Sequence, residues 1–343
     1  MQISLTYEEL LCKYKNLNYI MIDVRSESEF SEYTIPGSIN IPILSDKERE
    51  AVGYAYTKVS KEEAKILGIE YVSRKLPTIF KEILSLQDKY TNLIFFCARG
   101  GYRSSSITVL MQSIGINANK LIGGYKGYRN YINKNLNSLI EPIELVVLYG
   151  NTGTGKTKVL NELKKLGADV LDLEYCANHR GSVLGSVGLD KPNSQKMFES
   201  LIFDILYNRK SNLLFVEGES KTIGKSTIPD KLFDKIKNGI HVNITSSIED
   251  RIDNIYEDYI CGDDENIIKS LENLRNRMGN YWVDQKINLV KSKNYKDAIK
   301  DLILYYYDPL YQKNKKEYAL TLENNNPSDT AKILYDYIKK DES

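Results

Sequence analysis

The sequence predicts an α/β protein in two parts, each with a parallel sheet covered by helices, the second part ending in a helical region. Three observations support this prediction. Short apolar runs alternate with stretches of helical spacing in both parts. One apolar run in each part leads directly into a glycine-rich loop, and a helical stretch follows that loop. Beyond about residue 248 the pattern is mostly helical.

The elements of the first part follow from apolar runs and their spacing. A buried-strand pattern of β-branched and aromatic residues ends at Cys97, and a helical stretch later stops at Gly115. Proline removes a backbone donor and clashes inside a helix, so the long helical stretch is expected to break near Pro77. The expected elements are strands at 19–24, 38–43 and 92–96 and helices at 60–90 and 104–115.

The second part begins after a polar stretch at residues 133–144. We therefore divide the chain into a first domain at 1–138 and a second domain at 139–343, with the boundary in the neighbourhood of 136–143. The second domain opens on a fresh strand, and two later apolar runs look like further strands of the same sheet. These three strands are expected at 145–150, 213–218 and 241–244.

Composition excludes several classes of protein. The chain has 343 residues, of which 42% are hydrophobic and 27% charged, values ordinary for a soluble globular protein. It has no apolar run of about 18 residues or more, so we expect no membrane-spanning helix. Its first residues include early acidic positions and no apolar core with a small-residue cleavage site, which argues against a secretory signal. The net charge of +1 does not by itself indicate nucleic acid, although a local basic face stays open.

The four cysteines are scattered along the chain with no close pair. This spacing predicts neither a disulfide framework nor a zinc site, and it fits a reducing cytoplasm. The expected localisation is therefore cytoplasmic. The cysteines are Cys12, Cys97, Cys176 and Cys261.

The string GNTGTGKT at 150–157 has the spacing of a phosphate-binding P-loop and lies between an expected strand and an expected helix. Its glycines let successive backbone N–H groups point inward at phosphate oxygens, and the helix N-terminus adds partial positive charge. Lys156 supplies a mobile full charge, and the hydroxyl of Thr157 is placed to hold Mg²⁺. The glycines concerned are Gly150, Gly153 and Gly155.

Further polar chemistry in the second domain is less specific. Glu217 ends a hydrophobic strand at the place of a second metal-side acid, although acids often end such strands. The segment 172–188 holds Asp172, His179 and Arg180, which we take as candidate metal-side or substrate residues. An ordered loop with a hydrogen-bonded histidine is an equally open interpretation. Cys176 in the same segment is interpreted as a spare thiol.

The string CARGGYRS places Cys97 after a strand and just before a helix, with two arginines in between. Converging amides, the helix N-terminus and the guanidinium groups of Arg99 and Arg103 favour an anion, and they also favour thiolate over thiol. We therefore predict that Cys97 is a reactive nucleophile beside an anion site rather than a structural thiol. The anion loop is completed by Gly100, Gly101 and Ser104.

The stretch 19–43 resembles the opening of rhodanese domains, and 121–129 resembles the glycine pair near the end of such domains. On this resemblance the first domain is rhodanese-like, and Cys97 matches the persulfide-carrying cysteine. The C-x5-R spacing is one residue wider than in ordinary sulfurtransferases and is similar to that of rhodanese-fold phosphatases, whose loop accepts a tetrahedral phosphate. Thr34 and Phe96 stand where histidines occur in these relatives, so a general phosphatase is not expected.

A rhodanese-like domain joined to a P-loop NTPase-like domain resembles the tRNA 2-selenouridine synthases. Five segments carry this resemblance in the family's order: 45–68, 97–104, 150–157, 172–182 and 216–224. The resemblance implies a transferase that acts on the wobble uridine in the anticodon region of tRNA. That enzyme alkylates the sulfur of 2-thiouridine with geranyl diphosphate, then uses selenophosphate to replace S-geranyl with selenium. It also implies that Cys97 carries selenium as S-selanylcysteine and that no membrane is involved.

Other functions remain open from the sequence. A rhodanese-type sulfurtransferase with a nucleotide-binding regulatory domain, a small-molecule kinase with a rhodanese-fold module, and a non-catalytic tRNA-binding scaffold are the alternatives. Contacts to tRNA are least readable. Arg180, the lysines after residue 264 and the tyrosines at 305–311 are candidates, and those tyrosines are equally interpretable as core.

Overall fold

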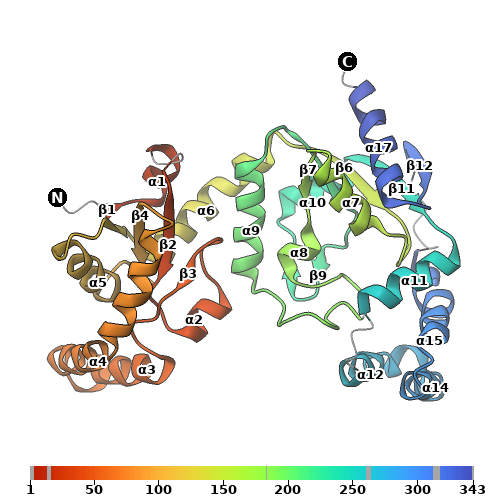
Figure 1. Ribbon diagram of the computed structural model, residues 1–343. Coiled ribbons are helices and arrows are strands. Elements are labelled where there is room, and N and C mark those ends of the chain that lie inside the picture. Colours follow the sequence, from red (N-terminus) through yellow and green to blue (C-terminus); the bar gives the residue numbers. More distant parts are fainter. Residues whose placement is uncertain (1–3, 14–16, 183, 260–263, 312–316, 342–343) are drawn as a thin grey trace. The chain divides into compact units, whose positions relative to one another are not determined.

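The computed structural model describes residues 4–13, 17–182, 184–259, 264–311 and 317–341 (Figure 1). The chain forms two compact units, Met1–Leu136 and Asn137–Ser343. The division falls within the helix α6 (Gly124–Ile140). Each unit contains its own five-stranded sheet, so the α/β fold class predicted from the sequence is confirmed.

The sheet of the first unit is entirely parallel. Parallel strands need crossover connections, and the helices between successive strands provide them. The central strands are almost continuously buried, as expected when helices cover both faces of a sheet. In sheet order the strands are β1 (Ser4–Leu5), β5 (Ala118–Leu121), β4 (Asn92–Phe96), β2 (Tyr19–Asp23) and β3 (Ile39–Asn40).

Two helices of the first unit begin at serine caps. Ser45 caps its helix by accepting a hydrogen bond from the Glu48 amide, and Ser60 does the same for Glu63. The described helices are α1 (Tyr7–Lys13), α2 (Glu27–Glu32), α3 (Asp46–Tyr54), a π-helical turn (Ala55–Val59), α4 (Lys61–Gln87), α5 (Tyr102–Ser113) and α6.

The expected break near Pro77 is wrong. The helix α4 runs without interruption from Lys61 to Gln87 with Pro77 inside it. Only one amide is missing from a helix of 27 residues, and the apolar face continues on both sides of the proline. Leu76 packs against the core before it, and Ile79 and Ile83 are buried after it. This tertiary packing outweighs the local cost of proline in a helix.

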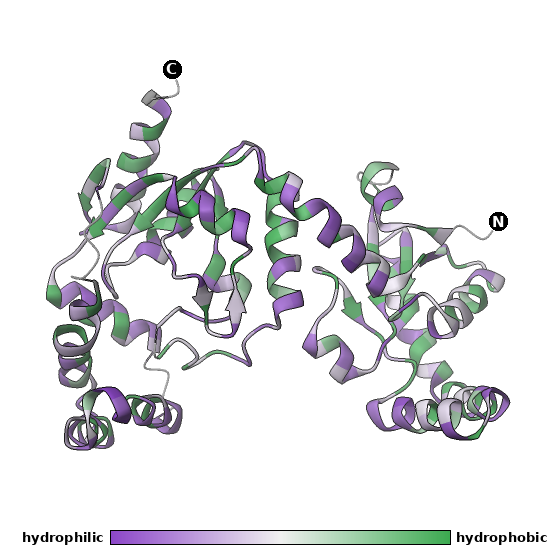
Figure 2. Cartoon of the chain, turned by 180° about the vertical axis from the view of Figure 1, so that it is seen from behind, coloured by the Kyte–Doolittle hydropathy of each residue, from purple (hydrophilic) through white to green (hydrophobic). Residues whose placement is uncertain are grey.

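The sheet of the second unit is also entirely parallel, and the three strands expected there are neighbours in it. Figure 2 shows most of these strands in the green of apolar residues. In sheet order they are β12 (Leu320–Glu323), β11 (Ile240–Thr245), β6 (Glu144–Tyr149), β8 (Leu213–Glu217) and β7 (Asp169–Leu171). A small antiparallel pair stands apart from the sheet, formed by β9 (Thr222–Ile223) and β10 (Ser226–Thr227).

Helices α7 (Lys156–Lys165), α8 (Leu173–Ala177), α9 (Gln195–Asn208) and α10 (Asp230–Lys237) lie between these strands in the chain. The region after residue 248 is helical as predicted, except that β12 returns to the edge of the sheet before α17 (Pro327–Asp341). Its other elements are α11 (Ile248–Tyr259), α12 (Asp264–Glu272), α13 (Arg275–Met278), α14 (Asn280–Lys291), α15 (Tyr295–Asp301), a π-helical turn (Leu302–Tyr307) and α16 (Asp308–Tyr311).

The structure also bears on three further expectations, which concern the tyrosines at 305–311, the cysteines and membrane-spanning helices. Of the tyrosines expected at 305–311, Tyr306 and Tyr307 belong to the helical core, whereas Tyr305 is 59% exposed. Three cysteines carry free thiols, and Cys261 lies outside the described residues. Among the described helices, none has both the length and the apolar character needed to cross a membrane.

Candidate active sites

The first candidate site surrounds Cys97, which follows the last residue of β4 and precedes the N-terminus of α5. Its side chain is 3% exposed, and its Sγ atom lies 3.3 Å from the hydroxyl oxygen of Ser104. Gly100 adopts φ +66° in the turn between them, a conformation that favours glycine. Gly101 is the residue before α5, so the loop ends where a helix presents its unpaired amides.

The surroundings of Cys97 favour the thiolate. Burial opposes the charge, but hydrogen bonds from the hydroxyl and amide of Ser104 and from the amide of Arg99 outweigh it, helped by the charge of Arg103. Together they hold the pKa of Cys97 below its ordinary value. A buried thiol without such donors would shift the other way, as Cys176 does: burial raises the pKa of that thiol. Cys97 therefore combines nucleophilic character with an anion-favouring loop.

The two loop arginines differ in their surroundings. Arg99 is exposed, so its side chain is open to an arriving anion. Arg103 is held by Glu29 on α2 through two hydrogen bonds, of 2.6 and 3.2 Å. Burial opposes ionisation of Glu29, but the Arg103 guanidinium holds the pKa of this carboxyl below its ordinary value. Sequence reasoning assigned Arg103 to the anion and gave no role to Glu29, which orients it.

A second glycine-rich turn, at residues 123–126, contacts the Cys97 loop through backbone hydrogen bonds. The amide of Tyr125 donates to the carbonyl of Cys97 and that of Lys126 to the carbonyl of Ala98, each at 2.9 Å. A side-chain carbon placed on Gly124 would lie only 2.1 Å from the Cys97 carbonyl oxygen. This close approach explains why glycine occupies that position at the start of α6.

The second candidate site is the P-loop between β6 and α7. Gly150, Gly153 and Gly155 have φ values of 152°, 86° and 81°, which L side chains rarely adopt. The ammonium of Lys156 donates to the carbonyl of Gly150 at 3.0 Å. The hydroxyl of Thr157 donates to a carboxylate oxygen of Glu217 at 2.6 Å. The structure thus brings the residues that the sequence predicts to bind phosphate together with the strand-end acid that it singled out.

Side chains from distant parts of the second unit hold the carbonyl groups of this loop. Arg251 donates to the carbonyl of Thr152 at 2.9 Å, Asn254 to that of Gly153 at 2.9 Å, and Asn324 to that of Thr154 at 2.8 Å. Within the loop the amide of Thr154 donates to the carbonyl of Asn151, and the three side chains fix three further carbonyls. Local sequence gave no signal for these residues, because they lie about a hundred or more positions downstream.

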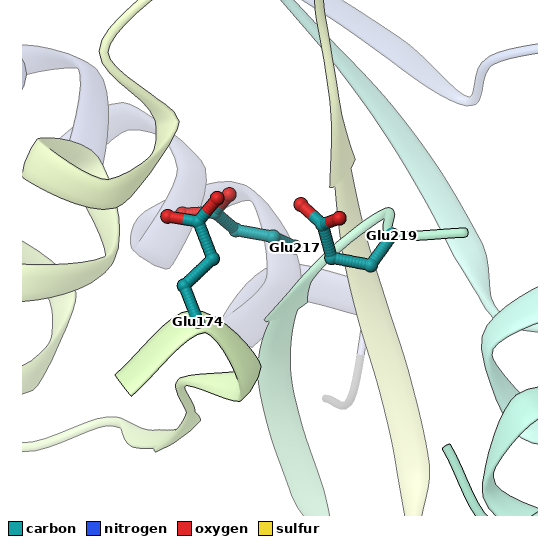
Figure 3. A group of neighbouring side chains, drawn as sticks. All are labelled: Glu174, Glu217 and Glu219. Atoms are coloured by element: carbon teal, nitrogen blue, oxygen red, sulfur yellow. The ribbon is translucent and has the colours of Figure 1, made fainter. Parts of the chain in front are cut away.

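Three glutamates gather with their carboxylates close together, as Figure 3 shows, and one of them, Glu217, contacts Thr157 of the P-loop. Glu174 comes from α8, Glu217 from the end of β8 and Glu219 from the segment after it, and one carboxylate oxygen of each lies within 4.8 Å of the others. Burial is the main cause that raises the pKa of all three carboxyls. Repulsion from neighbouring acids adds to it, from other glutamates and Asp172 at Glu174 and Glu217 and from Asp172 at Glu219, and Lys156 partly offsets the shift. The arrangement suits a cation that would neutralise it.

Sequence reasoning named the segments that hold Glu174 and Glu219 but not these two residues. A usable signal was present for Glu219, because its spacing of two from Glu217 repeats an acid across the end of a strand. Glu174 had no comparable signal, since only the fold brings α8 to the end of β8.

The P-loop and the glutamates line one cavity of about 450 Å³. Asp172 and Arg180 also line it, whereas His179 is not among its lining residues. The ring of His179 instead accepts a hydrogen bond from the amide of Gly181 at 3.1 Å and packs where side chains on Gly185 or Gly224 would collide with it. Asp172 caps α8 by accepting from the Tyr175 amide, and burial raises the pKa of its carboxyl.

Two family models match the chain. A rhodanese-like domain matches residues 6–131, and the tRNA 2-selenouridine synthase AAA domain matches residues 143–341, more than half of the chain. The chain belongs to the tRNA 2-selenouridine synthase family. The two matched regions contain the Cys97 loop and the P-loop respectively.

Members of the tRNA 2-selenouridine synthase family are similar to most of this chain. The one from Nitrosomonas europaea is 34% identical over 244 residues, covering 70% of this chain and 63% of its own length. The one from Bdellovibrio bacteriovorus is 30% identical over 346 residues, covering 87% of this chain and 90% of its own length. Among solved structures, an N-terminal domain from Clostridium difficile 630 is 40% identical, covers 38% of this chain and 98% of its own, and has a TM-score of 0.36.

Proposed function

We propose that this protein converts the wobble 2-thiouridine of tRNA into 2-selenouridine through an S-geranyl intermediate, using geranyl diphosphate and selenophosphate. Family membership supports a tRNA-modifying transferase that introduces selenium. The observation that carries the proposal further is the presence of two different anion-binding loops in one chain, a thiolate loop at Cys97 and a P-loop beside three glutamates.

The P-loop is the proposed site of the first step. The thiocarbonyl sulfur of the uridine forms a bond to the allylic carbon of geranyl diphosphate, the carbon–oxygen bond to diphosphate breaks, and the N3 proton of the base is lost. The amides of the loop and Lys156 bind the departing diphosphate, where preorganised donors lower the barrier most.

The glutamates and Thr157 have the chemistry of a Mg²⁺ site. Carboxylate and hydroxyl oxygens are the ligands that this ion prefers, and the raised pKa values of the three carboxyls mean that the bare cluster is electrostatically unfavourable. We assign Thr157, Glu217 and the neighbouring Glu174 and Glu219 to hold it. When bound, Mg²⁺ supplies charge neutralisation to the diphosphate.

The Cys97 loop is the proposed site of the second step. Selenophosphate is a tetrahedral anion, and Arg99, Arg103 and the helix N-terminus favour an anion beside the thiolate. The Cys97 thiolate forms a bond to C2 of the base, the bond from C2 to the alkylated sulfur breaks, and that sulfur leaves with a proton as geranyl thiol. The selenium of selenophosphate then forms a bond to C2 and displaces the thiolate, and water cleaves the selenium–phosphorus bond to release phosphate. S-selanylcysteine is not part of this route, because its sulfur–selenium bond could form from selenophosphate only with a two-electron oxidant. Alkylation assists this exchange, because it turns the sulfur into a leaving group.

The proposal also includes contacts to tRNA and a cytoplasmic location. The exposed side chain of Tyr305 is available to stack on a base. Arg180 instead lines the cavity, and its guanidinium carbon lies 5.1 Å from the centre of the Tyr259 ring. The described cysteines are free thiols, which supports action in a reducing cytoplasm.

The proposal is tested by mass spectrometry of nucleosides from tRNA treated with purified protein, geranyl diphosphate and selenophosphate in turn. We expect S-geranyl-2-thiouridine with the first donor and 2-selenouridine with both. The Cys97→Ser variant should accumulate the geranylated nucleoside and form no 2-selenouridine. Ser104→Thr, which keeps a hydroxyl beside Cys97, is the matched control and should still form it. Formation of 2-selenouridine by Cys97→Ser would contradict the assignment of that loop.

A further inference from the structure

The cavity beside the P-loop has an apolar part that phosphate binding does not use. Four of its lining side chains are 2 to 7% exposed, so they are core residues that also face the cavity. A small anion needs no such surface, and metal binding does not use it either. The part of the apolar lining formed by the loop before α9, α11 and residues 306–310 comprises Leu189, Ile255, Tyr259, Tyr306, Tyr307 and Leu310.

This apolar lining begins at the phosphate loop itself. A side-chain carbon on Gly153 would lie 3.0 Å from Cδ1 of Ile255, so the two residues are in close contact. Residues four apart share one face of a helix, and Tyr259 therefore continues the surface of α11, displaced by about 6 Å along the axis. The apolar face thus extends from the phosphate loop along α11.

The second side of the lining comes from residues 306–310 and is fixed to the same loop. Asp308 pairs with Arg251 at 2.6 Å and accepts from the side chain of Asn151 at 3.0 Å. Arg251 lies one turn before Ile255 on α11 and binds the carbonyl of Thr152. One ion pair therefore ties the phosphate loop, α11 and the segment 306–310 together.

The polar tip of Tyr259 is bonded within the protein. The hydroxyl of Tyr259 lies 2.9 Å from the hydroxyl of Ser182. Arg180 stacks over its ring and donates to the carbonyl of Val187 at 2.8 Å. With these polar groups already bonded, the lining offers carbon surface to a ligand.

We propose that the hydrocarbon chain of the allylic diphosphate lies between α11 and residues 306–310, and that Tyr306 and Leu310 determine which chain length is accepted. This inference rests on the function proposed above, since it concerns the same substrate at the same loop. A P-loop continued by an apolar lining matches a diphosphate whose other end is a hydrocarbon. Burial of the hydrocarbon is favourable against the apolar lining, and binding of the diphosphate is favourable at the polar loop.

The test measures rates of tRNA alkylation by the full-length protein with dimethylallyl, geranyl and farnesyl diphosphates, which contain one, two and three isoprene units. Tyr306→Ala should raise the rate with farnesyl relative to geranyl diphosphate by about tenfold, a usual size for discrimination in an apolar pocket. Tyr281→Ala is the matched control, because Tyr281 is 78% exposed and is not among the lining residues. Its ratio should stay that of the unchanged protein.

Leu310→Trp reduces the apolar space instead of enlarging it. Leu310 is half-buried, so a larger side chain is tolerated better there than at Tyr306. It should lower the rate with geranyl relative to dimethylallyl diphosphate by about tenfold. If Tyr306→Ala does not fold, judged by circular dichroism, this variant decides alone. Unchanged ratios in the folded variants would overturn the inference.

Calorimetric binding separates this inference from the function on which it rests. The unchanged protein with Mg²⁺ should bind geranyl diphosphate more tightly than inorganic diphosphate, and Leu310→Trp should reduce that difference. Equal binding of the two compounds would overturn the role of the apolar lining and leave the diphosphate site standing. Binding of neither would overturn both the inference and the proposed first step.

Discussion

The two glycine-rich loops of this protein share a backbone plan but differ in their electrostatics. Each follows a buried strand of a parallel sheet and ends at the start of a helix. The Cys97 loop carries its own arginines, and the pKa of its thiol is lowered. The P-loop has one lysine facing three carboxyls whose pKa values are raised. The same geometry therefore suits an anion directly in the first case and an anion together with a cation in the second.

This difference predicts that removal of divalent metal separates the two steps, which is the largest effect we expect. With EDTA present, geranylation should fall by about 10²–10³-fold, because the diphosphate loses a principal source of charge stabilisation. Selenation of tRNA geranylated beforehand should be little changed. Spermidine in both reactions keeps the tRNA folded. Equal loss of both steps in nucleoside mass spectrometry would contradict the comparison.

Glu29 should matter only to the Cys97 loop, because it orients Arg103 through two hydrogen bonds. We expect Glu29→Gln to slow selenation by about tenfold through weaker positioning of this guanidinium, while geranylation is unchanged. Glu27→Gln, at an exposed position on the same helix, is the control and should match the unchanged protein. The rates of geranylation and of selenation are measured separately. If Glu29→Gln and Glu27→Gln had equal effects on selenation, Glu29 would have no role in positioning Arg103.

Asn324 reaches the P-loop from the segment after β12 and joins it to the first turn of α17. Its amide donates to the carbonyl of Thr154 at 2.8 Å, and its own oxygen accepts from Thr330 at 3.0 Å. Asn324→Ala should lower the free energy of unfolding by about 1–3 kcal/mol, since a buried carbonyl loses its partner. Urea unfolding measures this, with the exposed Asn325→Ala as control. If Asn324→Ala were as stable as the control, the hydrogen bond from Asn324 to the carbonyl of Thr154 would not stabilise the fold.

The fold was predictable where local patterns decide it. Apolar runs ending in glycine-rich loops gave the central strands and both loops, and C-x5-R and the P-loop spacing gave Cys97, Arg103, Lys156 and Thr157. Partners supplied by the fold were not predictable. Asn324 follows Thr154 by 170 positions, and the wrong break at Pro77 arose because tertiary packing outweighs a local cost.

The smallest predicted effect concerns the titration of Cys97. The hydroxyl of Ser104 bonds its sulfur and favours the thiolate, so Ser104→Ala should raise the pKa of Cys97. The thiolate fraction at neutral pH should then fall, and the pH dependence of iodoacetamide reaction should move to higher pH. Ser106→Ala, at an exposed position on the same helix, is the control. A shift to lower pH in Ser104→Ala would contradict this account of the loop.

The central claim is that the two loops catalyse different steps, and the Lys156→Ala variant tests it most directly. This variant is given tRNA that already carries S-geranyl-2-thiouridine, together with selenophosphate, and nucleosides are followed by mass spectrometry. The account predicts 2-selenouridine at close to the rate of the unchanged protein, although the same variant fails to geranylate thiolated tRNA. Failure of Lys156→Ala to form 2-selenouridine from the geranylated tRNA would contradict the separation of the two loops.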